Sequence, residues 1–575
     1  MSLKKLEKNE IASLLDSIRA EYCDSCVLKN YSKEQVYFWA FSSLDSSFID
    51  LLYRSLQERK NYLDVDFPAI RNAIREELVL FRNNPSGNLN INSFNNCLND
   101  IQTKTIMDLC EFNIIRNRLE TAYLGDVDLF YDAATKQMQV TDESNSAALA
   151  RYEDAEKYSY NKDSFEKNGA DYLVSYIVGA KEAIVYNYCL GNLTKAELLL
   201  QKYIPSDHIP ILDEHNFKFY EKGIQKLIDF VKEDYNAKME VSQNYKFVEF
   251  EINDYKIIYC CLMALCINSM KFCFTECVEK NIIPNPAVIW KKKALINFIA
   301  HFSLLSEDKI VYIIDNFLVF RSNFQFNNER EYLAIYHPIL DFDDTYIISC
   351  SLTLISRAQR KLIWQINKEA KTNKVYEKAI SEMAHEKEKL MINEINTFLK
   401  QTRCDIRRNV RFHGVQTKNA EVEIDISIYD KKSRILLLME CKDLLPIDNE
   451  IERSNQDKKL KEFSKDRAQK SVFIENNLVK YMKDVHRKVE IPNKVISLIV
   501  SNHYGGSCTE STPVKIVSKA TLFKVLKNSS FNLHKALETI SAGDIMPTQI
   551  QKIHKICSFN GYTLECNIVD TRLIQ

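Results

Sequence analysis

Hydrophobic positions divide the chain into a long helical part and a shorter mixed part. In much of the first 305 residues, apolar side chains recur at three- and four-residue spacing, which predicts amphipathic helices. The clearest such stretches after residue 118 are 170–203, 216–235, 254–279 and 285–305. A short hairpin is expected at 126–142, and a few strands follow Phe317, where the pattern becomes alternating and β-branched. Helical spacing returns at about 352–402, with a break at 371–374, where we place the main domain boundary.

The part of the chain from about residue 376 alternates between helices and strands. The expected order is helix, two strands joined by a turn, helix and strand; the tail adds two more strands. In sequence, these elements are 375–401, 420–430, 433–443, 457–485, 494–502, 513–518 and 562–569. The fold class is therefore multidomain, with a helical region over 1–245, a helical then β-containing region over 246–375, and an α/β domain with a C-terminal extension over 376–575.

The first strand of the C-terminal domain has one apolar and one acidic side. Because side chains alternate along a strand, the apolar residues should share one face and the polar residues the other. The two sets are Val422, Ile424, Ile426 and Ile428, and Glu421, Glu423, Asp425 and Ser427. We expect the first set to face a core and the second to form an acidic face.

The second strand is apolar on both sides from Ile435 to Met439, which predicts a central strand. It ends in Glu440 and Lys442, and charges there are costly unless they are paired or bound to metal. If the two strands are neighbours, Asp425 lies beside Glu440, and a divalent cation would offset the repulsion.

The preceding helix supplies a third acid. Glu388 interrupts a stripe that should pack on the sheet, formed with Ala384, Met391, Ile395 and Phe398.

A helix with Glu388, a strand with Asp425, a turn and a strand ending in Glu440-Cys441-Lys442 resembles the PD-(D/E)XK, or restriction-endonuclease-like, nuclease superfamily. The resemblance covers about residues 376–505, and Ile424 stands where many members have proline before the acid. It implies an α/β/α fold with a central mixed sheet. It also implies that Asp425 and Glu440 bind metal and that Glu388 completes the metal shell.

The same resemblance implies a metal-dependent endonuclease that hydrolyses phosphodiester bonds, with DNA favoured over RNA as the substrate. Mg²⁺ is the expected cofactor, with Mn²⁺ able to substitute, and the backbone carbonyl of Cys441 is expected as a further ligand. Lys442 would orient the attacking water or stabilise the transition state. Two alternatives stay open. One is an RNA endonuclease of the same fold, and the other is an inactive nuclease-like scaffold that binds a protein partner.

The next helix offers a surface for nucleic acid. Lys458, Lys461, Lys465 and Gln469 follow one another at three- and four-residue spacing, as phosphate-contacting residues would. The resemblance to the nuclease superfamily implies that a polar residue of this helix, often Gln or Lys, faces the active site, and Gln469 and Lys465 are the candidates. The alternative is a solvated helix face, because acidic residues interleave with the lysines.

The composition of the chain excludes several classes of protein and of binding site. Lys plus Arg number 77 and Asp plus Glu 78, so any basic face must be local. No phosphate-binding loop motif is present. Five cysteines within 260–277 are expected to be core residues, with zinc ligation as the alternative. The first 22 residues lack the apolar run of a signal peptide, and the most apolar stretch, 257–267, is too short to cross a bilayer. We therefore expect a cytoplasmic protein. A helical region followed by a nuclease-like domain resembles the layout of defence nucleases that combine a sensor with a cutting domain, and this resemblance implies a defence-type effector.

Overall fold

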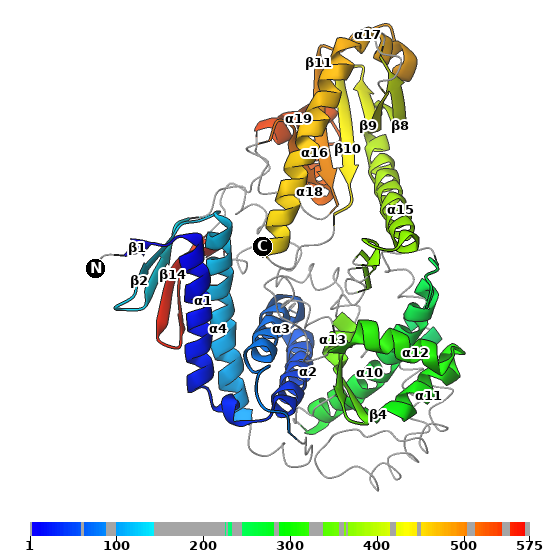
Figure 1. The fold of residues 1–575 in the computed structure, drawn as a ribbon. Coiled ribbons are helices and arrows are strands. Elements are labelled where there is room, and N and C mark those ends of the chain that lie inside the picture. The colour runs from blue at the N-terminus through cyan, green and yellow to red at the C-terminus, as the bar shows by residue number, and fades with distance from the viewer. Residues whose placement is uncertain are drawn as a thin grey trace.

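The computed structural model shows a multidomain protein of helices and three mixed sheets (Figure 1). The part of the chain that it describes is 3–58, 62–87, 99–142, 225–232 in part, 244–280, 287–320, 337–355, 362–367 in part, 369–414, 421–444, 450–502, 512–542 and 552–569. The helix predicted at 170–203 and most of that at 216–235 lie outside these residues. Within them, no helix is long and apolar enough to cross a membrane.

One body, here called the N-terminal unit, is formed by the described residues that precede α15 together with the last two strands of the chain, and it carries two of the sheets. One sheet has the strand order β1-β2-β3-β14-β13, and the other β4-β7-β6-β5. Its helices are α1 (Lys8–Ser25), α2 (Lys33–Glu58), α3 (Tyr62–Leu80), α4 (Asn99–Leu124), α10 (Ile252–Lys280), α11 (Lys292–Ser303), α12 (Glu307–Ile313) and α13 (Cys350–Ile355). Its strands are β1 (Lys4–Lys5), β2 (Leu129–Asp132), β3 (Gln137–Val140), β4 (Val288–Lys291), β5 (Val319–Phe320), β6 (Ile339–Phe342), β7 (Thr345–Ile348), β13 (Lys552–Phe559) and β14 (Tyr562–Val569).

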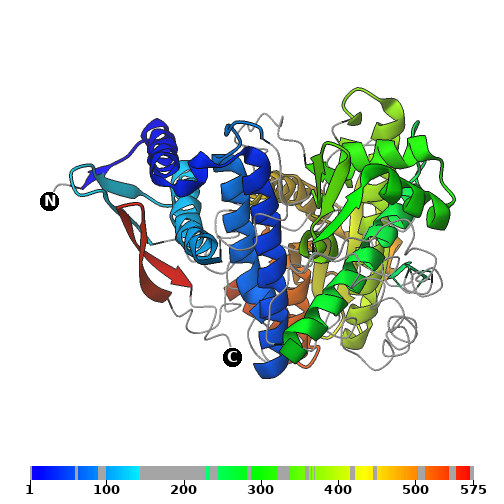
Figure 2. The same cartoon turned by 90° about the horizontal axis from the view of Figure 1, so that it is seen from below.

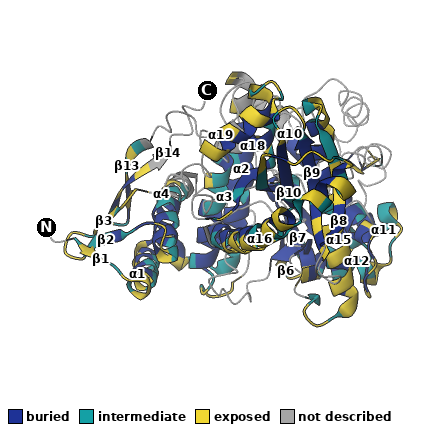
Figure 3. Cartoon of the chain, turned by 90° about the horizontal axis from the view of Figure 1, so that it is seen from above, coloured by how far each residue is buried: buried dark blue, intermediate teal, exposed yellow. Residues whose placement is uncertain are grey.

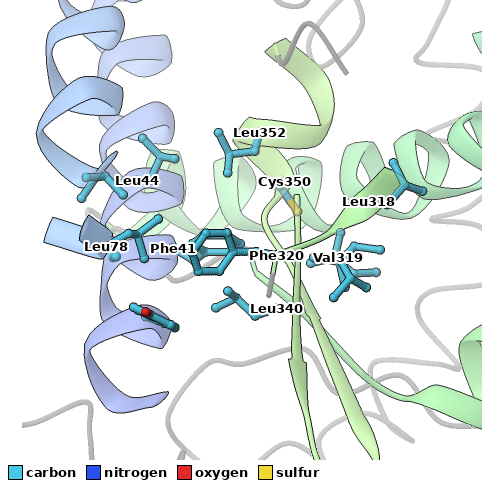
Figure 4. Close-up of a cluster of buried hydrophobic side chains, with 14 of the residues drawn as sticks. Phe41, Leu44, Leu78, Leu318, Val319, Phe320, Leu340, Cys350 and Leu352 are labelled. Atoms are coloured by element: carbon cyan, nitrogen blue, oxygen red, sulfur yellow. The ribbon is translucent and has the colours of Figure 1, made fainter. Parts of the chain in front are cut away.

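A single hydrophobic core joins the two regions that the sequence predicts as separate, 1–245 and 246–375. Figure 4 shows Phe41, Leu44 and Leu78 of the α2–α3 pair facing Phe320 and Leu340 of the second sheet. Cys260, Cys261 and Cys266 of α10 are buried in the same core, as the core interpretation predicts. The boundary at 245 is therefore not a domain boundary, because apolar residues on both sides bury one another.

A buried carboxylate strengthens this junction. Asp45 of α2 accepts hydrogen bonds from the backbone N–H groups of Cys350 (2.8 Å) and Ser351 (2.9 Å) and from the Ser349 hydroxyl (2.6 Å). These donors lie at the first turn of α13, whose free N–H groups need acceptors. Asp45 is thus a helix cap supplied from a distant part of the chain.

The C-terminal hairpin belongs to the N-terminal unit. β14 pairs in parallel with β3, with Thr563 opposite Gln137 and Glu565 opposite Gln139. Figure 2 shows the hairpin, in red, beside the first strands of the chain. The segment 376–575 therefore does not form one spatial domain. Its last strands complete a sheet that begins at Lys4, because the amphipathic β13–β14 hairpin buries one face against α1 and α4.

The second body, here called the α/β unit, holds a five-stranded sheet of order β12-β11-β10-β9-β8. Its strands are β8 (Asp405–His413), β9 (Glu421–Asp430), β10 (Ile435–Lys442), β11 (Lys494–Ser501) and β12 (Lys515–Ser518). Its helices are α15 (Lys374–Leu399), α16 (Glu450–Asn476), α17 (Leu478–Tyr481), α18 (Lys519–Asn528) and α19 (Leu533–Ala542). β8, β9 and β10 are antiparallel, whereas β10, β11 and β12 run parallel.

Helices cover both faces of this sheet. α15, α18 and α19 pack on one face, and α16, α17 and a π-helical turn at Met482–His486 pack on the other. β10 is the middle strand and is buried throughout Ile435–Met439, as its two-sided apolar pattern predicts (Figure 3). The result is three layers, helix, sheet and helix.

Three local predictions are wrong. Residues 288–291, predicted as helix, form β4, because Val288 to Trp290 pair with β7 and are buried. Residues 405–413, where the sequence analysis gives no strand, form the edge strand β8. On α15, Met383 is buried where Ala384 was expected, and Ala384 is exposed.

α15 links the two units. Its first half, with Tyr376 and Met383, packs into the core of the N-terminal unit, and its second half, with Ile395, packs under the sheet. The hydroxyl of Tyr245 donates to Glu386 (3.2 Å). The predicted boundary at 371–374 is the start of α15, where the Asn373 side chain accepts from a backbone N–H of the first turn. The helix that follows this boundary, α15, contributes buried residues to both units.

Candidate active site

The candidate site lies where the sheet of the α/β unit splits. The β9–β10 ladder ends at the pair Ile426–Met439. Beyond it, β9 continues only with β8, and β10 continues only with β11 as far as Lys442. Asp425 and Glu440 would form the next pair and therefore lie at the branch point. The predicted neighbour relationship of the two strands is confirmed.

β9 changes its facing direction at this branch. Val422 and Ile424 pack on the α16 side of the sheet, whereas Ile426 and Ile428 pack on the α15 side. The prediction that all four share one face is therefore wrong. The change occurs opposite Asn409 of β8, whose φ of 48° is left-handed and interrupts the regular pleat. Strict alternation would place Asp425 on one face of the sheet together with Glu421, Glu423 and Ser427. In the structure, its carboxylate instead points towards β10 and contacts Cys441.

The Asp425 carboxylate bridges the open end of the ladder. It accepts a hydrogen bond from the backbone N–H of Cys441 at 2.7 Å. Burial, and then the nearby charge of Glu440, raise the pKa of Asp425 to about 6, although the Cys441 N–H and Lys442 act in the opposite direction. The observed contribution of Cys441 is its N–H, and the role of its carbonyl as a metal ligand stays a prediction.

Lys442 joins two of the predicted acids. Its ammonium lies 3.2 Å from Glu388 Oε1 and 3.3 Å from Glu440 Oε1. Negative charge on Glu440, Glu388 and Asp425 raises the pKa of Lys442 against the effect of its burial, so the lysine is protonated at neutral pH. Glu388, Asp425, Glu440 and Lys442 therefore meet in one site, although α15 is separated from β10 by two strands in sequence.

Two further cations reach Glu440 from α16. Lys470 lies 3.3 Å from Glu440 Oε2, and the Arg467 guanidinium lies 3.8 Å from the same oxygen. Arg467 is fully buried, and its three guanidinium nitrogens have no hydrogen-bond partner in the described part of the chain. A detectable signal in the sequence is that Arg467 lies on the buried stripe of α16, with Leu460, Ser464, Ser471 and Ile474.

The predicted nucleic-acid residues lie on another face of α16. Lys458, Lys461, Lys465 and Gln469 are all exposed. Gln469 and Lys465 were expected to face the site, but Lys470 contacts Glu440 instead. The phase of α16 explains this difference, since its buried stripe runs through Arg467 and brings Lys470, three residues later, to the edge of the sheet.

A second polar cluster in the α/β unit could not be found from sequence spacing. The Ser427 hydroxyl lies 2.8 Å from Nε2 of His486, whose Nδ1 lies 3.0 Å from the Asp405 carboxylate. The order of groups is that of a hydrolase triad, but Ser427 and His486 are buried. Burial lowers the pKa of His486 more than Asp405 raises it. These residues therefore join β8, β9 and the π-helical turn and offer no accessible nucleophile.

The acids of the candidate site are engaged by protein groups. Asp425 is bonded to the Cys441 N–H, and Glu388 and Glu440 are paired with cations. Across the described ranges, no three His, Cys, Asp or Glu side chains are arranged as a ready-made metal centre. The carboxylates are brought together, but their present orientation is set by hydrogen bonds and ion pairs within the protein.

In comparisons with known proteins, no family model, curated protein or solved structure matches this chain.

Proposed function

We propose that the protein is a metal-dependent nuclease that hydrolyses phosphodiester bonds in DNA, with a fold related to that of the PD-(D/E)XK nucleases. The observation that carries this proposal is the meeting of Glu388, Asp425, Glu440 and Lys442 at the split between β9 and β10. The antiparallel meander β8-β9-β10, followed by α16 and the parallel strand β11, supports the fold relationship.

The donor set suits a hard divalent cation. All three acids offer carboxylate oxygens, the ligands that Mg²⁺ and Mn²⁺ prefer. The raised pKa of Asp425 reflects burial and repulsion from Glu440, and a divalent cation between them would relieve that repulsion. When bound, the ion would acidify the attacking water and neutralise charge on the phosphate.

The chain's own residues divide the remaining work. Asp425 and Glu440 would hold the ion, with Glu388 completing its shell directly or through water. The Lys442 ammonium would orient the water or stabilise the charge that develops on the phosphate. Its contacts with Glu388 and Glu440 fix this ammonium at the branch of the sheet, which limits the reorganisation needed during reaction.

A regulatory role for the N-terminal unit follows from its contacts with both helices of the site. Tyr245 donates to Glu386, two residues before Glu388 on α15. Arg453 at the start of α16 forms an ion pair with Asp126. A protein partner or other trigger that shifts the N-terminal unit would therefore act on the helices that carry Glu388 and Lys470, as in a defence effector with a sensor region.

The test is cleavage of matched DNA and RNA substrates by the full chain in the presence of Mg²⁺. We expect the DNA to be cut and the RNA to be cut more slowly. Faster cleavage of RNA would reassign the substrate, and intact DNA and RNA under all conditions would favour the inactive scaffold.

A further inference from the structure

Glu440 is held by three cations at once. Lys442 approaches Oε1 at 3.3 Å, Lys470 approaches Oε2 at 3.3 Å and Oε1 at 3.4 Å, and the Arg467 guanidinium is 3.8 Å from Oε2. Both carboxylate oxygens that a metal would need are therefore already in contact with positive groups.

The charges of the site balance before any ligand enters. Among the residues that the structure describes there, the carboxylates Glu388, Asp425 and Glu440 face the cations Lys442, Arg467 and Lys470. With all six ionised, the cluster is formally neutral. A divalent cation would leave it with two excess positive charges in a partly buried place, which is unfavourable. Nearby phosphates supply the missing negative charge.

The three cations differ in their freedom to move. The Arg467 side chain is 0% exposed, Lys442 is 19% exposed and Lys470 is 33% exposed. Lys470 also carries its charge on a flexible stem at the edge of the sheet, so it can exchange a carboxylate for a phosphate at the lowest cost.

We propose that Lys470 is a built-in counter-ion of Glu440, and that a nucleic-acid phosphate draws it away so that metal binding and nucleic-acid binding strengthen each other. This inference rests on the proposed function. The free protein binds a divalent cation weakly, because Glu440 must first give up an ion pair. The nucleic acid accepts the released ammonium and balances the charge of the ion. Linkage then requires the ion to tighten nucleic-acid binding by the same factor.

The experiment measures the Mn²⁺ affinity of the full chain by electron paramagnetic resonance, alone and with a phosphorothioate-linked DNA duplex that resists cleavage. For the wild type, we expect the duplex to tighten Mn²⁺ binding by about tenfold or more, within the range of coupled sites. Lys470→Gln should tighten Mn²⁺ binding to the free protein by about two- to fivefold, the strength of a partly exposed ion pair. It should weaken the effect of the duplex by the same factor, while Lys470→Arg should behave as the wild type.

The matched control is Lys459→Gln, which removes a charge from an exposed position of α16 about 16 Å along the helix. It should leave the Mn²⁺ affinity of the free protein unchanged. Equal Mn²⁺ affinity with and without the duplex, or a wild-type value for free Lys470→Gln, would overturn the coupling while leaving the metal site in place. Mn²⁺ binding that survives undiminished in Asp425→Asn would instead overturn the proposed function.

Discussion

The carboxylate of Asp425 accepts a hydrogen bond of 2.7 Å from the backbone N–H of Cys441, across the point where β9 leaves β10. Cys441 lies between Glu440 and Lys442 on β10, so the contact fixes the Asp425 carboxylate of β9 next to these two residues. It therefore holds the carboxylate in a place where burial and a like charge oppose its ionisation.

This placement predicts a pH-dependent effect of Asp425→Asn on stability. The pKa of Asp425 is about 6 in the folded protein, whereas an unfolded aspartate titrates near pH 4. The folded state therefore binds the extra proton between these values, and stability is lost as the pH rises through 6. Asparagine cannot ionise but can still accept from Cys441, so Asp425→Asn should stabilise the metal-free protein by roughly 2 kcal/mol at pH 8.

The measurement is chemical denaturation in EDTA at several pH values. The difference between Asp425→Asn and the wild type should disappear below about pH 4. Glu423→Gln, on the exposed part of the same strand, is the control and should show no such trend. A variant that is less stable than the wild type at pH 8 would show that the Asp425 carboxylate is not under the predicted repulsion.

Lys442→Ala should separate catalysis from folding. Lys442 is the last residue of β10, so its truncation opens little of the apolar core. In the proposed mechanism, the Lys442 ammonium, held by Glu388 and Glu440, acts on the reacting groups, and loss of one such electrostatic contact lowers a reaction rate by about 10²–10³-fold. Cleavage rate, DNA affinity and melting temperature are measured together, with Lys432→Ala in the exposed β9–β10 turn as the control. Cleavage by Lys442→Ala at the wild-type rate, or a loss explained by unfolding, contradicts this role.

The elements around the site were predictable because their signals are local. An uninterrupted apolar run identifies β10 as a central strand, and the 3.6-residue period identifies α15 and α16. The meeting of Asp425, Glu440 and Lys442 follows from strand order and turn length, both of which can be read from adjacent segments.

The features that could not be predicted depend on distant parts of the chain. β9 changes the face to which its apolar residues point opposite Asn409, a left-handed residue of the neighbouring strand β8, and an alternation rule applied to β9 alone does not contain such a change. Ser427 and His486 are 59 positions apart and meet only through the packing of the π-helical turn. Lys470 contacts Glu440 because α16 packs with the face that carries Arg467 against the sheet. The buried stripe of α16 indicates this orientation, whereas the spacing of the exposed lysines favoured another face of the helix.

The packing of the C-terminal hairpin β13–β14 predicts that truncation of a buried side chain there destabilises the protein far from the candidate site. Phe559 of β13 is buried, and its ring centroid lies 4.6 Å from that of Tyr22 and 4.7 Å from that of Phe112. Phe559→Ala should therefore destabilise the N-terminal unit by about 3–5 kcal/mol. Ile556→Ala, on the same strand but exposed, should change stability by less than about 0.5 kcal/mol.

Limited proteolysis during thermal denaturation locates this defect. In Phe559→Ala, fragments from the N-terminal unit should appear at a lower temperature than in the wild type, while the α/β unit stays resistant. Early cleavage within 405–501 in this variant would show that the hairpin stabilises the α/β unit, which would contradict the prediction.

The central claim is that Asp425 and Glu440 form a metal-dependent cutting site, and its most direct measurement is the rate of DNA cleavage as a function of Mg²⁺ for the wild type and Glu440→Gln. We expect the wild type to cut at a rate that saturates with Mg²⁺ and is abolished by excess EDTA. Ca²⁺ should support binding of DNA better than its cleavage. Glu440→Gln should remain folded and fail to cut at every Mg²⁺ concentration. Undiminished cleavage in excess EDTA, or wild-type cleavage by Glu440→Gln, would contradict the claim.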